Sequence, residues 1–366
     1  MLDIVLVIAV LAFIVLVHEL GHFLVAKWSN IDVPEFGIGL PPRIWGKKFG
    51  NTLYSLNWIP FGGFVRIAGD DEDAVPDQAE IPNTRGFKDK SFFTKTSVMV
   101  GGVVANVYLA FVFLAFAFWF GLPVSVDSFP DVPMRDTWVA ITGTVEGSPA
   151  ARVGFILPAR VEAISAGDTK VDVLNEFDII NAVRGTRGTN VTIYIKEQGG
   201  LIKSFTVTPT VSGDNPFPSI GANLDLVGVG DYGLLAAFGQ AYTFSGKIIV
   251  DTARGIVSLL IRSLSGTASL DGVSGPIGIA GILGDARSEG VGPFLFIVVI
   301  ISMSLAVINF VPFPALDGGR FLFLLIEAVL RRPIKPIISR TVNLVGFMLL
   351  LLLMVFVTYH DIARMW

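Results

Sequence analysis

The chain has 366 residues, of which 52% are hydrophobic and 16% are charged, with a net charge of -4. An average soluble chain is about 25% charged, so this composition excludes an ordinary soluble protein and indicates an integral membrane protein. The charge balance offers no basic excess for a nucleic-acid partner, and the absence of cysteine excludes disulfides, thiolate zinc ligands and cysteine nucleophiles.

Four stretches are long and apolar enough to cross a bilayer, which needs about 20 such residues. We expect the membrane helices within residues 1–27, 97–121, 292–314 and 342–360. The first stretch has no basic start and no small-residue cleavage site, so we interpret it as a retained membrane helix and not as a signal peptide.

The distribution of Lys and Arg predicts the orientation. These residues gather in the loop 28–96 and in the connection 315–341, whereas the N-terminal tip has none. The positive-inside rule then puts both connections in the cytoplasm and both chain termini outside. We therefore expect a multi-pass protein of the inner (plasma) membrane, with the segment between the second and third spans outside the cytoplasm.

Two connections have structure of their own. In the cytoplasmic loop, Thr52 to Ile67 mixes aromatic and β-branched residues around Pro60, which predicts membrane-associated β-strands with a bend. Outside, residues 138–211 alternate short β-rich runs with Gly/Pro turns and one short helix, which predicts a small α+β domain.

The region 212–291 follows this domain as an extracytoplasmic linker. Within it, Tyr232 to Leu264 is apolar enough to suggest a fifth span. It also carries four charged residues that are costly at bilayer depth, Lys247, Asp251, Arg254 and Arg262. We therefore expect a surface or interfacial amphipathic helix here.

The first span contains the sequence HELGH, residues 18–22, which fits the pattern H-E-x-x-H. Residues i and i+4 share one face of a helix, so His18 and His22 can bind one zinc ion while Glu19 reaches a water molecule on it. The alternative is a set of polar side chains satisfied inside a helix bundle. Ionisable residues inside spans are rare and usually functional, which favours the metal site.

A catalytic zinc site normally has three protein ligands. His360 is a poor third ligand because it lies near the outer end of the last span. Asp317 is a better candidate, because Pro312 and Pro314 should end the third span just before it. Taken alone, Asp317 could equally be the N-cap of the next helix. With four spans, however, Asp317 and the two histidines come to the same, cytoplasmic side of the membrane.

In these motifs the chain resembles the site-2 protease family of intramembrane zinc metalloproteases, in its bacterial PDZ-containing form. The resemblance covers nearly the whole chain. It rests on HELGH (18–22), the β-hairpin region PPRIWGKKFGNTLYSLNWIPFGGFVRI (41–67), GGVVAN (101–106), GSPAARVG (147–154), SGPIGIAG (274–281) and NFVPFPALDGGR (309–320).

The resemblance implies that His18, His22 and Asp317 bind Zn²⁺ and that Glu19 is the catalytic base. It also implies one PDZ-like domain in residues 138–211, with a peptide or protein ligand. Further residues implied to contact the substrate are Asn106, Asn309, Asn57, Gly62 and Gly63. For the first two, hydrogen bonding between helices is an equal alternative.

The function implied is regulated intramembrane proteolysis, the cleavage of single-span proteins such as anti-sigma factors or remnant signal peptides. The predicted strands at Thr52 to Ile67 offer an edge to which an unwound substrate could add. The PDZ-like domain could filter substrates by size or recruit a partner. A non-catalytic membrane adaptor remains the alternative function, and a zinc transporter fits less well because no string of ligands marks a path.

Overall fold

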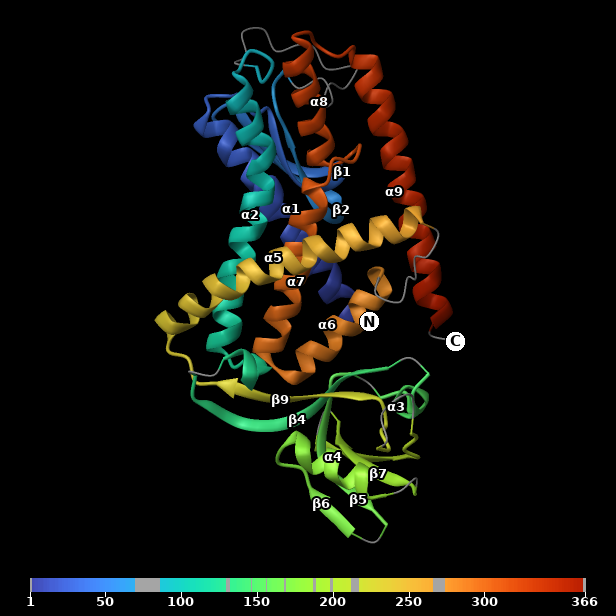
Figure 1. The fold of residues 1–366 in the computed structure, drawn as a ribbon. Coiled ribbons are helices and arrows are strands. Elements are labelled where there is room, and N and C mark those ends of the chain that lie inside the picture. The colour runs from blue at the N-terminus through green and yellow to red at the C-terminus, as the bar shows by residue number, and fades with distance from the viewer. Residues whose placement is uncertain are drawn as a thin grey trace. The chain divides into compact units, whose positions relative to one another are not determined.

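The computed structural model describes most of the chain. The described residues are 2–69, 86–129, 132–145, 147–155, 157–167, 169–186, 189–197, 200–211, 217–265 and 274–364. They form two compact units (Figure 1). The first comprises Met1–Phe116, Phe238–Arg287 and Phe294–Trp366, and the second comprises Ala117–Ala237 with Ser288–Pro293.

The first unit is largely helical. Its helices, in whole or in large part, are α1 (Leu2–Trp28), α2 (Phe92–Trp119), α5 (Leu234–Leu264), α6 (Pro276–Glu289), α7 (Val291–Phe310), α8 (Asp317–Leu330) and α9 (Pro336–Arg364). By length and composition, α1, α2, α7 and α9 could cross a membrane. Within the described part of the chain, the prediction of four membrane helices is therefore confirmed.

Glycines determine how α1 and α2 cross. Gly21 and Gly101 face each other, and a Cβ atom at Gly101 would lie 2.9 Å from the Gly21 carbonyl oxygen. A Cβ atom at Gly21 would collide with the Gly101 carbonyl oxygen in turn. Small residues allow two helix backbones to approach closely inside a membrane, where dispersion contacts replace the hydrophobic effect. The crossing is therefore specified by two positions that carry no side chain.

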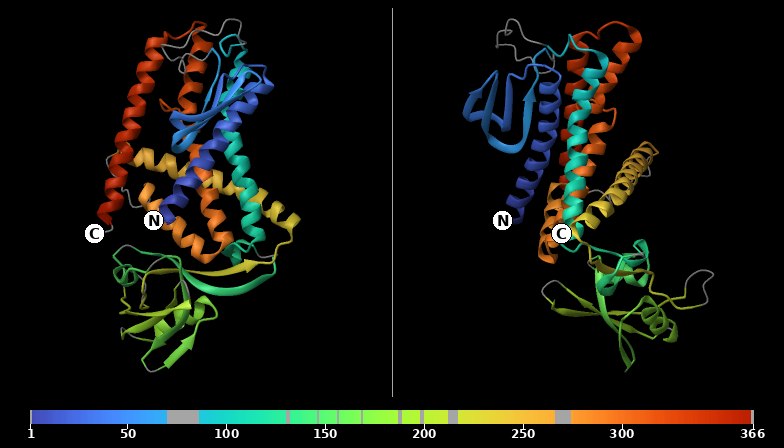
Figure 2. Two further views of the ribbon diagram at one scale, coloured as in Figure 1. Left: turned by 180° about the vertical axis from the view of Figure 1, so that it is seen from behind. Right: turned by 90° about the vertical axis from the view of Figure 1, so that its left-hand side faces the viewer.

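A small sheet stands beside α1 (Figure 2). It consists of β1 (Glu35–Phe49) and β2 (Thr52–Arg66), and both strands bend. As a result, the Glu35–Ile38 segment pairs on one side with Leu53–Leu56 and on the other side with Gly63–Arg66. β2 corresponds to the strands predicted at Thr52 to Ile67, and β1 is the other strand of the hairpin region 41–67 but begins earlier, at Glu35.

Two glycines bring β2 against α1. A Cβ atom at Gly62 would lie 2.7 Å from Val15, and one at Gly63 would lie 3.7 Å from Glu19 Cγ. Gly62 also has φ +73°, a backbone conformation that favours glycine. The last part of β2 thus runs directly past the glutamate of the HELGH sequence.

The second unit contains a seven-stranded sheet with strand order β3-β9-β4-β5-β7-β8, in which β6 pairs with β5. Its elements are β3 (Pro123–Ser125), a 3-10 turn at Val126–Ser128, β4 (Met134–Thr144), α3 (Pro149–Val153), β5 (Ala159–Ala166), β6 (Thr169–Asp172), α4 (Glu176–Gly185), β7 (Val191–Lys196), β8 (Ile202–Val207) and β9 (Ala222–Gly230). Its core includes the fully buried Ile141, Ile164 and Ile193.

This sheet extends beyond the predicted domain boundary at residue 211. β9 lies in the region that the sequence assigned to a linker, yet it pairs with both β4 and β3. The physical reason is that its sequence, ANLDLVGVG, has few large β-branched residues. β9 is held by pairing with β4 over most of its length, and that pairing is not visible in local sequence.

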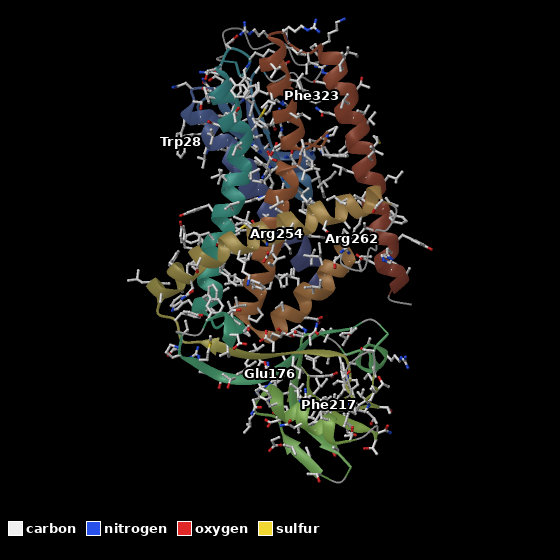
Figure 3. All side chains as sticks on the ribbon, in the orientation of Figure 1. Trp28, Glu176, Phe217, Arg254, Arg262 and Phe323 are labelled. Carbon is white, nitrogen blue, oxygen red and sulfur yellow. The ribbon has the colours of Figure 1, made fainter. Side chains whose placement is uncertain are left out.

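α5 matches the expected amphipathic helix and is not among the helices that could span a membrane in the described chain. Large apolar side chains recur on it every four to eight residues and are exposed, at Leu235, Tyr242, Val250, Val257 and Ile261. Arg254 and Arg262 also lie on this helix (Figure 3). The charged residues that excluded a fifth span are thus carried by a helix with an exposed apolar stripe.

α9 has polar attachments near its two ends. Asn343 Oδ1 accepts a hydrogen bond from the Ala315 backbone N–H at 3.2 Å. Near the other end, the buried Asp361 accepts hydrogen bonds from the backbone N–H groups of Gly275 (3.1 Å) and Gly278 (2.9 Å), where α6 begins. A side chain at either glycine would crowd this carboxyl group, which gives a reason for the two glycines of the SGPIG sequence.

Candidate metal centre

Three side chains from opposite ends of the chain meet inside the first unit. His18 Nε2 lies 2.9 Å from Asp317 Oδ2, and His22 Nε2 lies 3.1 Å from the same oxygen. The two histidine Nε2 atoms are 3.2 Å apart. Both histidines are buried, and Asp317 is partly buried. The structure therefore brings together the two histidines and the carboxylate that the sequence singled out.

The histidines share one face because they are one helical turn apart on α1. His22 Nδ1 also contacts the Val98 carbonyl oxygen at 2.7 Å. A carbonyl oxygen can only accept, so this nitrogen must carry the ring proton in the neutral form. The Nε2 atom of His22 is thereby left with a free lone pair toward Asp317 and His18.

Asp317 reaches the histidines because the chain turns sharply between α7 and α8. α7 ends at Phe310, shortly before Pro312 and Pro314, and Ala315 adopts a left-handed backbone conformation with φ +72°. Gly318 and Gly319 pack against the carbonyl oxygens of Val311 and Phe313 and leave no room for a Cβ atom. The LDGG sequence thus folds tightly against the preceding loop.

The alternative role of Asp317 as a helix N-cap does not hold. The N-cap position of α8 is Leu316, which has extended backbone angles and makes no side-chain cap. Asp317 is the first helical residue, and its carboxylate is directed to the histidines.

The three ligand atoms fit a zinc ion. Zinc–ligand distances of about 2.0–2.2 Å in a tetrahedral site correspond to ligand–ligand separations of about 3.3–3.6 Å. The observed separations of 2.9–3.2 Å are slightly shorter. A spreading of the three side chains by a few tenths of an ångström would therefore accommodate the ion, and two imidazoles with one carboxylate is a common catalytic zinc ligand set.

Glu19 borders a cavity of about 220 Å³ beside this cluster. The cavity is lined by Glu19, His22, Phe64, Val65, Ile67, Phe87, Val98, Met99, Asp317 and Arg320. The glutamate, one histidine and the aspartate thus face one space, together with two residues of β2. A peptide segment in this space would meet Glu19 together with His22 and Asp317.

The other predicted site residues lie in different settings. Asn57 is buried and donates hydrogen bonds to the Ile38 and Gly39 carbonyl oxygens, so it holds the bent sheet together. Gly62 and Gly63 pack on α1. Asn309 is half-buried near the end of α7, and Asn106 is fully buried beside His18.

Several cavity residues did not emerge from the sequence. Phe64, Val65 and Met99 give no chemical signal, because apolar side chains in a membrane protein are the expectation everywhere. Arg320 directly follows the LDGG sequence and could have been proposed from its charge near a span. His360 lies on α9 and is not part of the metal-ligand cluster found among the described residues.

Comparison with known proteins identifies the family. The family model of peptidase family M50 matches residues 6–353. The chain belongs to peptidase family M50, the site-2 protease family. A protein of Clostridium perfringens is 32% identical over 357 residues, covering 97% of each chain. A Geobacillus kaustophilus protein, RasP, is 27% identical over 448 residues, covering 98% of this chain and 97% of its own.

Both relatives are named zinc metalloproteases. The predicted family, the enzyme class of zinc metalloendopeptidase and the Zn²⁺ cofactor are therefore confirmed. The M50 protein is a membrane protease, consistent with its four apolar helices.

Proposed function

We propose that this M50 protein cleaves single-span membrane proteins, such as anti-sigma factors or remnant signal peptides, within or beside their membrane segment. The observation that carries this proposal is the meeting of His18 and His22 with Asp317 beside Glu19, where the two histidines and Glu19 lie on α1, a helix that could span a membrane. These three residues would hold Zn²⁺, and Glu19 would be the general base.

When bound, zinc supplies a Lewis acid that polarises the scissile carbonyl and makes a coordinated water easier to deprotonate. Glu19 accepts a proton from the attacking water as the new C–O bond forms. The same carboxyl group then passes the proton to the departing nitrogen as the C–N bond breaks, so that one water is consumed for each peptide bond. Gly63 lies beside Glu19, because a Cβ atom at this glycine would be 3.7 Å from Glu19 Cγ.

The test of this role is Glu19→Gln. The amide cannot accept the proton, so we expect cleavage of a reconstituted single-span substrate to fall by about 10²–10⁴-fold. Zinc content should be unchanged, because Glu19 is not a ligand. A chelator should abolish cleavage by the unmodified enzyme. A variant that keeps full cleavage activity would show that Glu19 is not the general base.

The edge of the bent sheet is a proposed substrate site. A membrane helix hides its amide groups, so it must unwind before hydrolysis, and an extended segment can then add to a strand edge. Among the described residues, the Gly63–Arg66 segment pairs with Glu35–Ile38 on one side only, and two residues of this segment, Phe64 and Val65, line the cavity. This arrangement supports strand addition next to Glu19.

Proline substitution tests the edge, because proline removes the N–H that an added strand would need. Phe64→Pro and Val65→Pro remove successive N–H groups, of which one points away from the sheet. The variant that loses the outward group should cleave slowly while its zinc content stays normal. Full turnover by both variants would rule out strand addition.

The second unit is proposed to be the extracytoplasmic PDZ-like domain. A deletion that follows the predicted boundaries, 138–211, would remove most of β4 and with it most of the strand pairing of β9. A cleaner deletion removes Met134 to Gly230 and joins the ends with a flexible linker. If the domain is a size filter, the deletion should allow cleavage of untrimmed substrates. If it recruits a partner or a peptide ligand, the deletion should abolish cleavage.

The proposed orientation puts the termini and the second unit outside, with Glu19 toward the cytoplasmic side. The absence of cysteine makes this directly testable with single introduced thiols. Ser91 and Ser204 are both exposed. A membrane-impermeant maleimide should label Ser204→Cys in intact cells, with the outer membrane opened where there is one, and Ser91→Cys only after the inner membrane is opened. The reverse labelling pattern would show that the proposed orientation is wrong.

A further inference from the structure

One face of α2 lies against the two histidines. Val98, Gly102 and Asn106 are spaced four residues apart, so they form one ridge of this helix. The Val98 carbonyl oxygen contacts His22 Nδ1. At Gly102 a Cβ atom would collide with His22 Nε2 and would lie 2.7 Å from His18 Cε1. Asn106 Nδ2 lies 3.4 Å from His18 Nδ1. Each residue of the ridge therefore meets an imidazole.

The contact between Asn106 and His18 has an unsatisfied group. The Asn106 side chain is fully buried, and its Oδ1 atom has no hydrogen-bond partner among the residues that the structure describes. If His18 offers its Nε2 lone pair to a metal, its Nδ1 atom must carry the ring proton and needs an acceptor. The nitrogen of the Asn106 amide cannot serve as that acceptor.

A half-turn of the amide group supplies the acceptor that His18 needs. The oxygen and nitrogen of an asparagine amide have nearly the same shape, and their assignment follows from the hydrogen-bond network. After the half-turn, Oδ1 accepts the His18 Nδ1–H, and the NH₂ group takes the position where Oδ1 lies now. His18 then has the same kind of support that the Val98 carbonyl gives to His22.

The backbone of Asn106 is also fixed. Its carbonyl oxygen accepts a hydrogen bond from Ser302 Oγ of α7 at 3.0 Å. Asn106 thus connects α2 to the helix that precedes Asp317, and its side chain meets the helix that carries the histidines. This is the setting of a residue that positions a ligand.

We propose that Asn106 is a positioning residue for His18, whose side-chain oxygen holds the imidazole with Nε2 toward the zinc. The inference rests on the proposed ligand set. It differs from a substrate contact, which the sequence also allowed for Asn106. In support, α2 contributes Val98 and Met99 to the lining of the cavity, and Asn106 is not among the lining residues.

The test compares zinc affinity among three variants, measured by competition with a chromogenic chelator. Asn106→Leu keeps the approximate volume but removes the acceptor, and we expect zinc to bind about 10–100-fold more weakly. Asn106→Asp keeps an acceptor oxygen and should restore the affinity. Asn309→Leu, a matched control on α7, should leave the affinity unchanged. Far-UV circular dichroism of the Leu variants shows whether they are folded.

A second readout does not depend on folding stability. The chain has three histidines, so ¹⁵N labelling gives a simple spectrum. In the zinc-loaded protein, His18 should show a single tautomer with the proton on Nδ1, and Asn106→Leu should show exchange broadening of that signal. Cobalt(II) loading should report the same disturbance as a changed visible absorption spectrum.

The outcomes separate this inference from the function on which it rests. If Asn106→Leu binds zinc normally but cleaves with a raised KM, Asn106 contacts the substrate and the inference is wrong. If His18→Ala loses zinc while Asn106→Leu does not, the ligand set stands and only the positioning role fails. If His18→Ala keeps zinc, the proposed ligand set fails as well.

Discussion

The helices α2 and α9 are nearly matched as membrane helices and differ in how they pack. Their candidate spans, Phe92–Trp119 and Pro336–Ala363, are both 28 residues long, with mean hydropathies of 2.2 and 2.4. Yet 44% of the most apolar stretch of α2 is buried in the protein, against 11% for α9. Hydropathy therefore predicts that a helix enters the membrane but not what it contacts there.

The difference comes from residue size. α2 has Gly101, Gly102 and several alanines on the faces that meet other helices, so it packs closely. From Leu351 to Phe356, α9 carries consecutive large side chains that are all exposed, and six consecutive residues cover every side of a helix. In a bilayer, large apolar side chains pack favourably against lipid, whereas small residues allow close contact between helices.

The largest effect is expected at Gly102. In Gly102→Val the side chain would occupy the space of the two imidazoles, and misplacing a reacting group by about 1 Å can cost about 100-fold in rate. We expect zinc content and proteolysis both to be lost. The control is Gly281→Ala on α6, where a Cβ atom meets open space. Normal zinc binding by Gly102→Val would mean that α2 does not shape the site.

A smaller effect is expected from the buried Leu114 of α2. Leu114→Ala should lower the free energy of unfolding by about 2 kcal/mol, the low end of the range for such core substitutions, because lipid is as apolar as the protein interior. Titration with a denaturing detergent measures it. A loss below about 0.5 kcal/mol would show that burial of α2 contributes little to stability.

The attachment of α9 by Asp361 should affect the global free energy of unfolding less than Leu114 does, because its loss is expected to stay local. Asp361→Ala removes the acceptor for two backbone N–H groups, and hydrogen bonds to charged groups contribute about 1.5–3 kcal/mol when buried. Because α9 has few other buried contacts, we expect the loss to appear locally, as faster hydrogen exchange of α6 and α9, with α1 and α2 unchanged. Uniform acceleration throughout the first unit would contradict this.

The smallest effect is expected from Leu352→Ala in the middle of α9. The Leu352 side chain is 68% exposed, so the substitution should change the free energy of unfolding by less than about 0.5 kcal/mol. The same detergent titration used for Leu114→Ala provides a direct comparison. An equal loss at the two leucines would remove the distinction between the helices.

The same comparison explains what the sequence could and could not predict. Long apolar runs and the HELGH spacing can be recognised in local sequence. With four spans, the first and third end on the same side of the membrane, and this was enough to predict that Asp317 lies near His18 and His22. The positions of β9 and Gly102 could not be predicted in this way. β9 depends on a partner strand about 85 residues earlier. Gly102 matters because its lack of a side chain leaves room for His18 and His22 on α1.

The sequence separation within the metal centre has a consequence for biosynthesis. His18 and Asp317 are 299 residues apart, and ribosomes add about 5–20 residues per second. About 15–60 seconds therefore pass between the synthesis of the helix that carries Glu19 and both histidines and the synthesis of Asp317. On the proposed ligand set, the nascent chain has no complete metal centre before Asp317 is made, so neighbouring proteins at the insertion machinery are not exposed to its activity until then.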